Sequence, residues 1–281
     1  MVQTTKAIAL EQTTHQLAPN VFACRQFTQA IVRQPALSLA AGITTQQLGT
    51  PDIELARQQH ALYIEALESL GVTVTVLDAL EEYPDSCFVE DVAIIHKGTA
   101  IITRPAATSR RSEINYIREL LAAKMSIVEL CDCDDAFVDG GDVLIHEDRV
   151  LIGLSQRTNS QGARWLAQRL YEIDANVQVT TVPLSGVLHL KTGMTALAPG
   201  LLLRDPACSI ATQFDFATMT VLPTIEGYAA DVVPVNDGII ITKGFPTVAA
   251  IAHESYARVI ELDMSEFRKM DGSLTCLSLL W

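Results

Sequence analysis

The sequence predicts an α/β protein in which five strand-strand-helix-strand (ββαβ) units close into a ring. Residues 137–184 contain two short apolar strands around a polar turn, then an amphipathic helix and a β-branched strand. Residues 87–130 repeat this order, with Asp91 before the first strand in the place of Asp142. Units of this size cannot bury their apolar faces alone, so they stack on copies of themselves. We therefore expect five units related by pseudo-fivefold symmetry.

The first unit is expected to lack one strand. Its elements are a strand over 27–35, a long loop over 36–51, a helix over 52–70 and a strand over 72–77. Asp52 or Thr50 starts the helix, and Gly71 ends it. A loop of this length is either a lid over a site or a surface excursion. Residues 1–22 show no period and are expected to lie over the surface.

The last two units follow the same order with local departures. The fourth begins at His189 and has a short linker helix before the strand in 219–225. The fifth begins at Asp231 and has a poorly helical segment after Pro246. The final strand, 273–281, supplies the strand that the first unit lacks. The two ends of the chain would then share a sheet and close the ring, which removes exposed sheet edges.

Length and charge restrict the classes of function. At 281 residues the chain could hold two average domains, but repeated units around one core indicate a single domain over 1–281. The chain has no apolar run long enough for a membrane span and no leader, so we expect a soluble, cytoplasmic protein without a membrane partner. A net charge of −13 argues against a nucleic-acid surface. The oligomeric state, a homodimer included, stays open.

The six cysteines do not form a CxxC pair. In an extended segment, Cys131 and Cys133 would lie on one face, but a metal site there would need further ligands. Buried free thiols are the ordinary interpretation, and neither a metal nor a cofactor is expected.

Residues that can carry chemistry stand where the first strands of the units begin. In a closed ring, equivalent strand ends converge on one mouth of the axis. The residues at those ends are Cys276, His189, Glu90 with Asp91, and Asp139 with Asp142. Each alone has an ordinary structural explanation, such as a buried strand cysteine or an aspartate that caps a turn. A thiol, an imidazole and several carboxylates in one pocket form a nucleophile-and-base constellation.

Two arginines occupy matching places in adjacent units. Arg110 and Arg157 both lie between a second strand and its helix, where solvated loop charge would explain either one alone. Together they can hold a carboxylate by forked hydrogen bonds. Glu90 and Asp91 are costly to bury without a cation, so a protein cation or a cationic ligand should pair with them. These features indicate a small-molecule site for a guanidino amino acid.

Several stretches resemble, in the same order, the dimethylarginine dimethylaminohydrolase family of guanidine-modifying enzymes. They are TQAIVRQP, PDSCFVEDVA, ITRPAATSRR, DGGDVL, GLSQRTNSQGA, LHLKTGM and MDGSLTC. The resemblance implies the pentein fold, a five-bladed α/β propeller. It also implies hydrolysis of N-omega-methylated arginine to citrulline and dimethylamine or methylamine. The region 36–51 departs most from the family pattern, which leaves substrate choice open.

The resemblance also implies roles for particular residues, matched motif by motif. Cys276 would be the nucleophile and His189 the proton donor and base, with Asp139 orienting the histidine. The implied substrate contacts are Asp85, Glu90 and Asp91 at the guanidinium, Arg110 and Arg157 at the carboxylate, and backbone groups of Ile43 and Met270.

These groups predict covalent chemistry. A thiol with an ordinary pKa of about 8.5 needs the histidine or a bound cation to become a thiolate at neutral pH. The thiolate would attack the guanidinium carbon, His189 would protonate the departing amine, and water would release citrulline from a thiouronium on Cys276. Alternatives with the same chemistry are an arginine deiminase and an amidinotransferase. A non-catalytic binding propeller is the alternative from another class.

Overall fold

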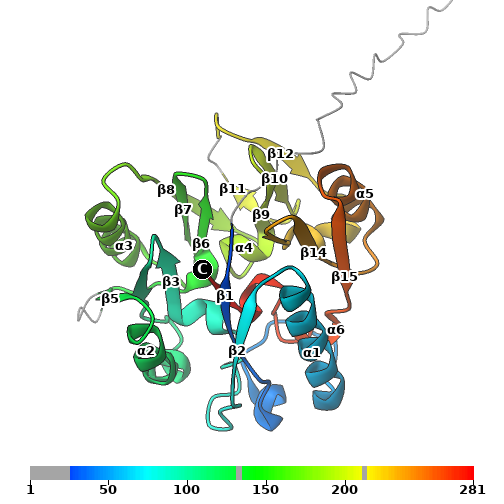
Figure 1. Cartoon of the computed structure of the whole chain (residues 1–281), viewed down its shortest axis with the longest axis horizontal. Coiled ribbons are helices and arrows are strands. Elements are labelled where there is room, and N and C mark those ends of the chain that lie inside the picture. Colours follow the sequence, from blue (N-terminus) through cyan, green and yellow to red (C-terminus); the bar gives the residue numbers. More distant parts are fainter. Residues whose placement is uncertain (1–25, 131–134, 211–213) are drawn as a thin grey trace, which may run out of the picture.

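The computed structural model describes residues 26–130, 135–210 and 214–281, and its strands form five small mixed sheets (Figure 1). In sheet order, the strands are β16 (Leu279–Leu280), β1 (Gln29–Arg33) and β2 (Thr73–Leu77); β3 (Ala93–His96), β4 (Thr99–Ile102) and β5 (Ser126–Glu129); β11 (Ser209–Ile210), β8 (Gln178–Ser185), β7 (Arg149–Leu154) and β6 (Val143–His146); β12 (Thr218–Val221), β10 (Leu201–Arg204) and β9 (Met194–Ala198); and β13 (Val233–Val235), β14 (Gly238–Thr242) and β15 (Arg258–Leu262).

Each sheet contains the same two kinds of strand pair, and in the four-stranded sheet β11 adds a further antiparallel pair with β8. One pair of strands is antiparallel, as in β3 with β4, and the next is parallel, as in β4 with β5. A parallel pair needs a crossover, which a helix supplies in four sheets. These helices are α1 (Ile53–Ser69), α2 (Asn115–Ala122), α3 (Ser160–Ile173) and α5 (Pro246–Ser255), all on the periphery in Figure 1. Helices α4 (Leu190–Gly193) and α6 (Ser265–Arg268) are single turns.

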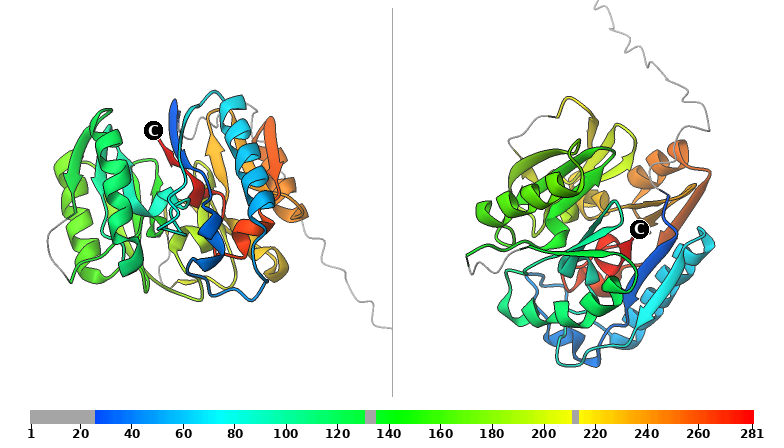
Figure 2. Two further views of the ribbon diagram at one scale, coloured as in Figure 1. Left: turned by 90° about the horizontal axis from the view of Figure 1, so that it is seen from below. Right: turned by 60° about the vertical axis from the view of Figure 1, so that its left-hand side comes forward.

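The two ends of the described chain meet in one sheet, as predicted. β1 pairs with β16, with Ala30 opposite Leu280 and Ile31 opposite Leu279. Figure 2 shows the red C-terminal strand beside the blue β1 in both views. Helix α1 also begins where predicted, because the Asp52 carboxylate accepts hydrogen bonds from the Glu54 and Leu55 amides.

Three local expectations need correction. The segment after Pro246 forms the regular helix α5, since proline is well placed at the first position of a helix. In the fourth unit, the described residues between β10 and β12 form β11 and turns rather than a linker helix. Cys276 lies on the 3₁₀ turn η6 (Thr275–Leu277), and only Leu279–Leu280 of the expected strand pair as a strand. Cys131, Cys133 and residues 1–22 lie outside the described residues.

The core consists of apolar clusters that join neighbouring sheets. One cluster packs Ile101 of β4 against Val150 and Ile152 of β7 and against Leu166 and Leu170 of α3. Each sheet therefore buries apolar surface against the next, as the repeat pattern requires. In the described parts of the chain, no helix is long and apolar enough to cross a membrane.

Candidate active site

A helical turn precedes the first strand of each sheet, and the polar residues lie on these turns or directly beside them. Besides η6, these turns are η2 (Val89–Val92) before β3, η4 (Gly140–Asp142) before β6, α4 before β9 and η5 (Thr224–Ala230) before β13. Because all five first strands line one central cavity, the turns lie close together. The remaining 3₁₀ turns are η1 (Leu37–Ala41) and η3 (Thr108–Ile114).

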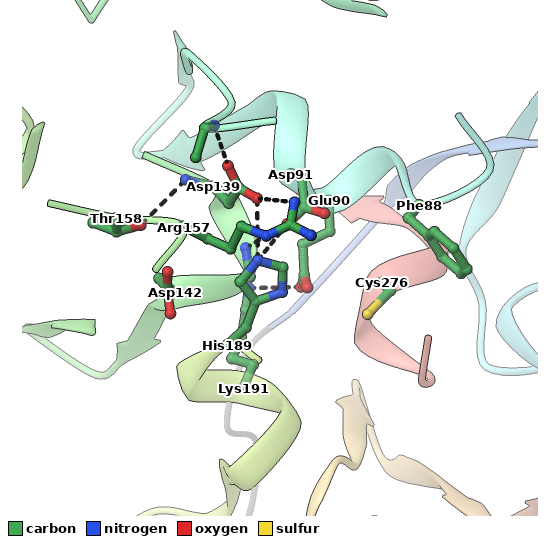
Figure 3. A network of polar contacts seen from close by, with 12 residues as sticks. Phe88, Glu90, Asp91, Asp139, Asp142, Arg157, Thr158, His189, Lys191 and Cys276 are labelled. Carbon is green, nitrogen blue, oxygen red and sulfur yellow. Dashed lines mark hydrogen bonds and ion pairs between the residues drawn. The ribbon is translucent and has the colours of Figure 1, made fainter. Parts of the chain in front are cut away.

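Cys276 and His189 line the same small pocket. Its empty volume is about 350 Å³, including the space open to solvent. Figure 3 shows His189 grouped with Asp139 and Arg157, while Cys276 enters from a separate segment. Eight of the ten predicted site residues line this pocket: Ile43, Asp85, Asp91, Arg110, Arg157, His189, Met270 and Cys276. Asp139 lies fully buried against His189, and Glu90 lines the central cavity.

Carboxylates hold the imidazole of His189 in place. Its Nε2 lies 3.1 Å from Asp139 Oδ2 and 3.9 Å from Asp91 Oδ1. Burial disfavours the imidazolium, but the charge of Asp91 and the hydrogen bond to Asp139 outweigh burial and raise the pKa of His189 to about 9. The ring is therefore protonated at neutral pH, which is the form that can donate a proton.

Gly140 and Gly141 allow the η4 turn to lie close to His189, Asp91 and the backbone of Glu90. A Cβ on Gly141 would lie 2.6 Å from His189 Nδ1 and 3.0 Å from Asp91 Oδ1. A Cβ on Gly140 would lie 2.0 Å from the Glu90 carbonyl oxygen. The Asp-Gly-Gly-Asp sequence thus lets the turn pack directly against the imidazole.

Asp91 is held as a carboxylate by a buried cation. Arg110 Nη1 lies 2.5 Å from Asp91 Oδ2, and the Gly141 amide donates to Asp91 Oδ1 at 3.0 Å. Burial opposes ionisation of Asp91, but His189 and Arg110 outweigh it and lower the pKa to about 2. Arg110 also pairs with Glu113 at 2.9 Å, so two carboxylates share its guanidinium.

The other two acidic residues of the predicted guanidinium set have different partners. Glu90 pairs with Lys191 at 2.6 Å and accepts a hydrogen bond from the Thr275 hydroxyl at 3.1 Å. Asp85 accepts the Ile43 amide at 3.0 Å, which ties the loop over the pocket to its wall. Burial raises the pKa of both carboxyls.

The thiol of Cys276 is buried among negative charges. Its side chain lies 3.5 Å from the Ser273 hydroxyl. Burial and the charges of Glu90, Asp231 and Asp91 raise its pKa well above the ordinary value. Without a bound cation, the protonated thiol is therefore favoured at neutral pH.

Asp91, Asp139 and His189 could hold a metal ion, because their ligand atoms lie within 4.8 Å of one another. Each already has a protein partner: Arg110 for Asp91, the Ala106 amide for Asp139, and Asp139 for the imidazole. The donor set fits a network that positions His189 better than an open metal site, which keeps free coordination positions.

Comparison with known proteins identifies the family. Residues 45–203 match the family model described as N,N dimethylarginine dimethylhydrolase, eukaryotic. The chain is 40% identical over 258 residues to the N(G),N(G)-dimethylarginine dimethylaminohydrolase of Pseudomonas aeruginosa, covering 90% of this chain and 99% of that protein. It is 33% identical to the Streptomyces coelicolor protein of the same name, covering 89% and 95%.

The chain belongs to the dimethylarginine dimethylaminohydrolase family. The α/β fold of this family extends over nearly the whole chain. The Pseudomonas aeruginosa dimethylarginine dimethylaminohydrolase, solved in complex with citrulline, superposes with a TM-score of 0.86 at 37% identity, covering 92% of this chain and all of that chain. The N-terminal domain of a cyanobacterial arginine dihydrolase shares the fold, with a TM-score of 0.78 at 19% identity over 91% of this chain and 97% of that domain.

Two groups beside this candidate site were not among the predicted residues. Lys191 neutralises Glu90. The position of Lys191 two residues after His189 does not indicate that it would lie close to Glu90. Asp231 is fully buried next to η6, where it accepts a hydrogen bond from the Thr275 amide at 3.1 Å. A signal for Asp231 was available, because it precedes a valine at the start of a first strand, as Asp91 and Asp142 do.

Proposed function

We propose that the chain hydrolyses N-omega-methylated arginine to citrulline and dimethylamine or methylamine. The observation that carries the proposal is the shared pocket of Cys276 and His189, with carboxylates beside the thiol and an arginine at the wall. Family membership supports the same activity, because two relatives carry the name dimethylarginine dimethylaminohydrolase and one is solved with citrulline.

Cys276 is proposed to be the nucleophile. A bound guanidinium places a positive charge beside the thiol and offsets the negative charges that raise its pKa. The thiolate then attacks the guanidinium carbon and forms a C–S bond. The substrate itself therefore promotes ionisation of the nucleophile.

His189 is proposed to act first as an acid and then as a base. Its pKa of about 9 keeps the imidazolium available at neutral pH, and this ring protonates the departing amine as the C–N bond breaks. The neutral ring next takes a proton from water, whose oxygen attacks the thiouronium carbon. The C–S bond then breaks and citrulline leaves. Asp139 orients the ring through its contact with Nε2.

The remaining pocket residues are proposed to bind the rest of the substrate. Asp85, Glu90 and Asp91 lie on the segment that would face the guanidinium, and Arg157 is the less buried of the two arginines proposed for the carboxylate. Backbone groups of Ile43 and Met270 at the pocket wall would make further contacts with the substrate.

We also propose that the five sheets are blades of a closed α/β propeller and that residues 1–281 form one domain. The lining of the central cavity by the first strands of all five sheets supports this arrangement. The pairing of β1 with β16 supports closure.

The test is product analysis with asymmetric dimethylarginine, monomethylarginine and arginine as separate substrates. Citrulline with dimethylamine from the first substrate is expected, and Cys276→Ser should remove turnover without changing the unfolding transition. Ammonia from arginine alone would indicate a deiminase, and amidino transfer to an added amine would indicate an amidinotransferase. Mass spectrometry of acid-quenched enzyme should find the thiouronium on Cys276. An active Cys276→Ser variant would remove the nucleophile assignment.

A further inference from the structure

A buried chain of hydrogen bonds connects the thiol of Cys276 to Asp231. The Ser273 hydroxyl lies 3.5 Å from Cys276 Sγ and makes a short hydrogen bond to Asp231 Oδ2. Ser273 and Asp231 are both fully buried. Within the described part of the chain, the hydrogen-bond partner of Cys276 Sγ is thus a serine, and His189 makes its contacts with Asp139 and Asp91.

Asp231 is held in a fixed orientation by the η6 turn. The Thr275 amide donates to Oδ1 at 3.1 Å, and the Thr275 hydroxyl lies 3.0 Å from Oδ2. That hydroxyl has one hydrogen and also lies 3.1 Å from Glu90 Oε2, so it can serve only one of the two carboxylates. When the Thr275 hydroxyl donates to Glu90, Oδ2 of Asp231 remains available to accept a proton from the Ser273 hydroxyl.

The charge environment raises the proton affinity of the Asp231 carboxylate. Among the described residues, the ion pairs include Asp91 with Arg110 and Glu90 with Lys191, but none with Asp231. Burial and the charge of Glu90 raise the pKa of Asp231 to about 7. The titratable groups that act on Asp231 or Cys276 include Glu90 and Asp91 on η2, Tyr63 on α1 and Tyr228 on η5. The charged and titratable residues that also line the pocket with Cys276 are Asp85, Arg110, Arg157, His189 and Asp271.

His189 is poorly suited to take the proton from the thiol. The carboxylates around it raise its pKa to about 9, so at neutral pH the ring already carries the proton that it must give to the departing amine. Another acceptor is needed if the thiolate is to form while His189 stays charged. Asp231 is a carboxylate that is connected to the sulfur, and within the described residues no ion pair compensates its charge.

We propose that Ser273 relays the thiol proton of Cys276 to Asp231 when a cationic guanidine or amidine binds. This inference rests on the proposed function of Cys276. The S–H bond breaks, the proton passes to Ser273 Oγ, and the hydroxyl proton of Ser273 passes to Asp231 Oδ2. A neutral thiol and a carboxylate become a thiolate and a neutral carboxylic acid, so the pair keeps its net charge. When the C–S bond of the thiouronium later breaks, the proton returns along the same path.

Ser273 contacts the reacting sulfur, whereas Asp231 acts through Ser273 as a positioning residue. The sequence left ionisation of the thiol to either the histidine or a bound cation, and the relay assigns it to a separate pair of residues. Asp231 and Ser273 serve ionisation of the nucleophile, and His189 serves the leaving group and the attacking water.

The test measures alkylation of Cys276 in the full chain as a function of pH. The probes are 2-chloroacetamidine, which is cationic, and iodoacetamide, which is neutral. In the wild type, the alkylation rate with 2-chloroacetamidine should become independent of pH above about pH 7, where Asp231 titrates. Above this pH, Cys276 and Asp231 together hold a single proton, so the fraction of thiolate that the bound amidine induces no longer changes with pH.

Two variants break the relay in different ways. Asp231→Asn cannot accept the proton, so its rate should rise about tenfold per pH unit, as for an isolated thiol. Ser273→Ala keeps the charge of Asp231 but removes the hydroxyl, and its rate at neutral pH should fall about tenfold, the usual scale for a hydrogen bond to a charged group. Ser255→Ala is the matched control, because that hydroxyl bonds the Ile251 carbonyl on α5.

Three results separate the outcomes. If mass spectrometry finds no amidine adduct on Cys276 of the wild type, the proposed function fails and the relay with it. If the wild type is alkylated but Asp231→Asn keeps the plateau, or Ser273→Ala reacts within about twofold of the wild type, the relay alone is wrong. If Asp231 acts only as a repelling charge, Asp231→Asn should react faster at neutral pH, which also overturns the relay. Reaction with iodoacetamide at high pH, expected to be equal in all variants, shows that the thiol remains intact and accessible.

Discussion

The ammonium of Lys191 lies 2.6 Å from the carboxylate of Glu90, with both side chains largely buried. Lys191 is on α4, two residues after His189, and Glu90 is on η2. Glu90 also accepts the Thr275 hydroxyl, directly before Cys276. The pair therefore links the histidine segment to the cysteine segment and supplies the cation that a buried glutamate requires.

Removing this cation should weaken guanidinium binding. In Lys191→Met, burial and Asp91 raise the pKa of Glu90 further, since the compensating charge is lost. We expect KM for methylarginine to rise about tenfold and the free energy of unfolding to fall by about 3 kcal/mol, the cost of an unpaired buried charge. Lys191→Arg keeps the positive charge, so its KM and its free energy of unfolding should lie between those of the wild type and Lys191→Met. Steady-state kinetics and urea denaturation give these values, and an unchanged KM would show that Glu90 does not face the substrate.

Arg157 should affect substrate affinity more than stability. Its side chain is 14% exposed at the pocket wall, and Nη1 lies 3.7 Å from Asp139 Oδ2, a loose contact. Arg157→Ala should raise KM at least about tenfold through loss of a charge-assisted hydrogen bond to the substrate carboxylate. Arg118→Ala is the control, because Arg118 pairs with Glu129 at the exposed surface. Equal KM values for the two variants would place the carboxylate elsewhere.

The charge of His189 should make stability depend on pH. The pKa of His189 is about 9 in the folded protein, above the unfolded value of about 6.5. The imidazole therefore binds its proton more tightly in the folded state. The resulting stabilisation is complete below about pH 6.5 and is lost as pH rises through about 9. Relative to His189→Gln, the free energy of unfolding of the wild type should therefore fall by about 3 kcal/mol over this window. Denaturant titrations at both ends of the window measure the difference. A parallel pH dependence in the two proteins would contradict the assignment.

Asp271 should hold the loop over the pocket closed. Its carboxylate accepts the Thr45 amide at 2.5 Å, the Thr45 hydroxyl at 2.9 Å and the Gln46 side-chain amide at 2.5 Å. Asp271→Ala removes these contacts, so amide hydrogen exchange of residues 43–46 should accelerate and KM should rise several-fold. Asp237→Ala, which breaks an exposed pair with Arg258, is the control. Unchanged exchange in residues 43–46 would show that other contacts hold the loop.

Local pattern was enough to predict most of the secondary structure. Short apolar runs around a polar turn placed β3, β4, β6 and β7, and apolar residues at helical spacing placed α2 and α3, because both patterns depend on neighbours within a few residues. The same reasoning failed after Pro246, where an evenly apolar segment hid the helix α5, whose buried residues include Val248 and Ala252. It also extended the last strand through Cys276, because apolar residues on a 3₁₀ turn and in a strand give the same sequence pattern over so few positions.

The sequence by itself determined the repeated units, the family, and which residues stand at the starts of the first strands. Only the tertiary structure decided their partners: Arg110 is shared by Asp91 and Glu113, Lys191 pairs with Glu90, and Asp231 reaches Cys276 through Ser273. Two of these contacts, Lys191 with Glu90 and Asp231 with Ser273, join different units, and a shift of about one ångström makes or breaks such a contact. Spacing along the chain carries no such precision, since it is the packing of one sheet on the next that sets these distances.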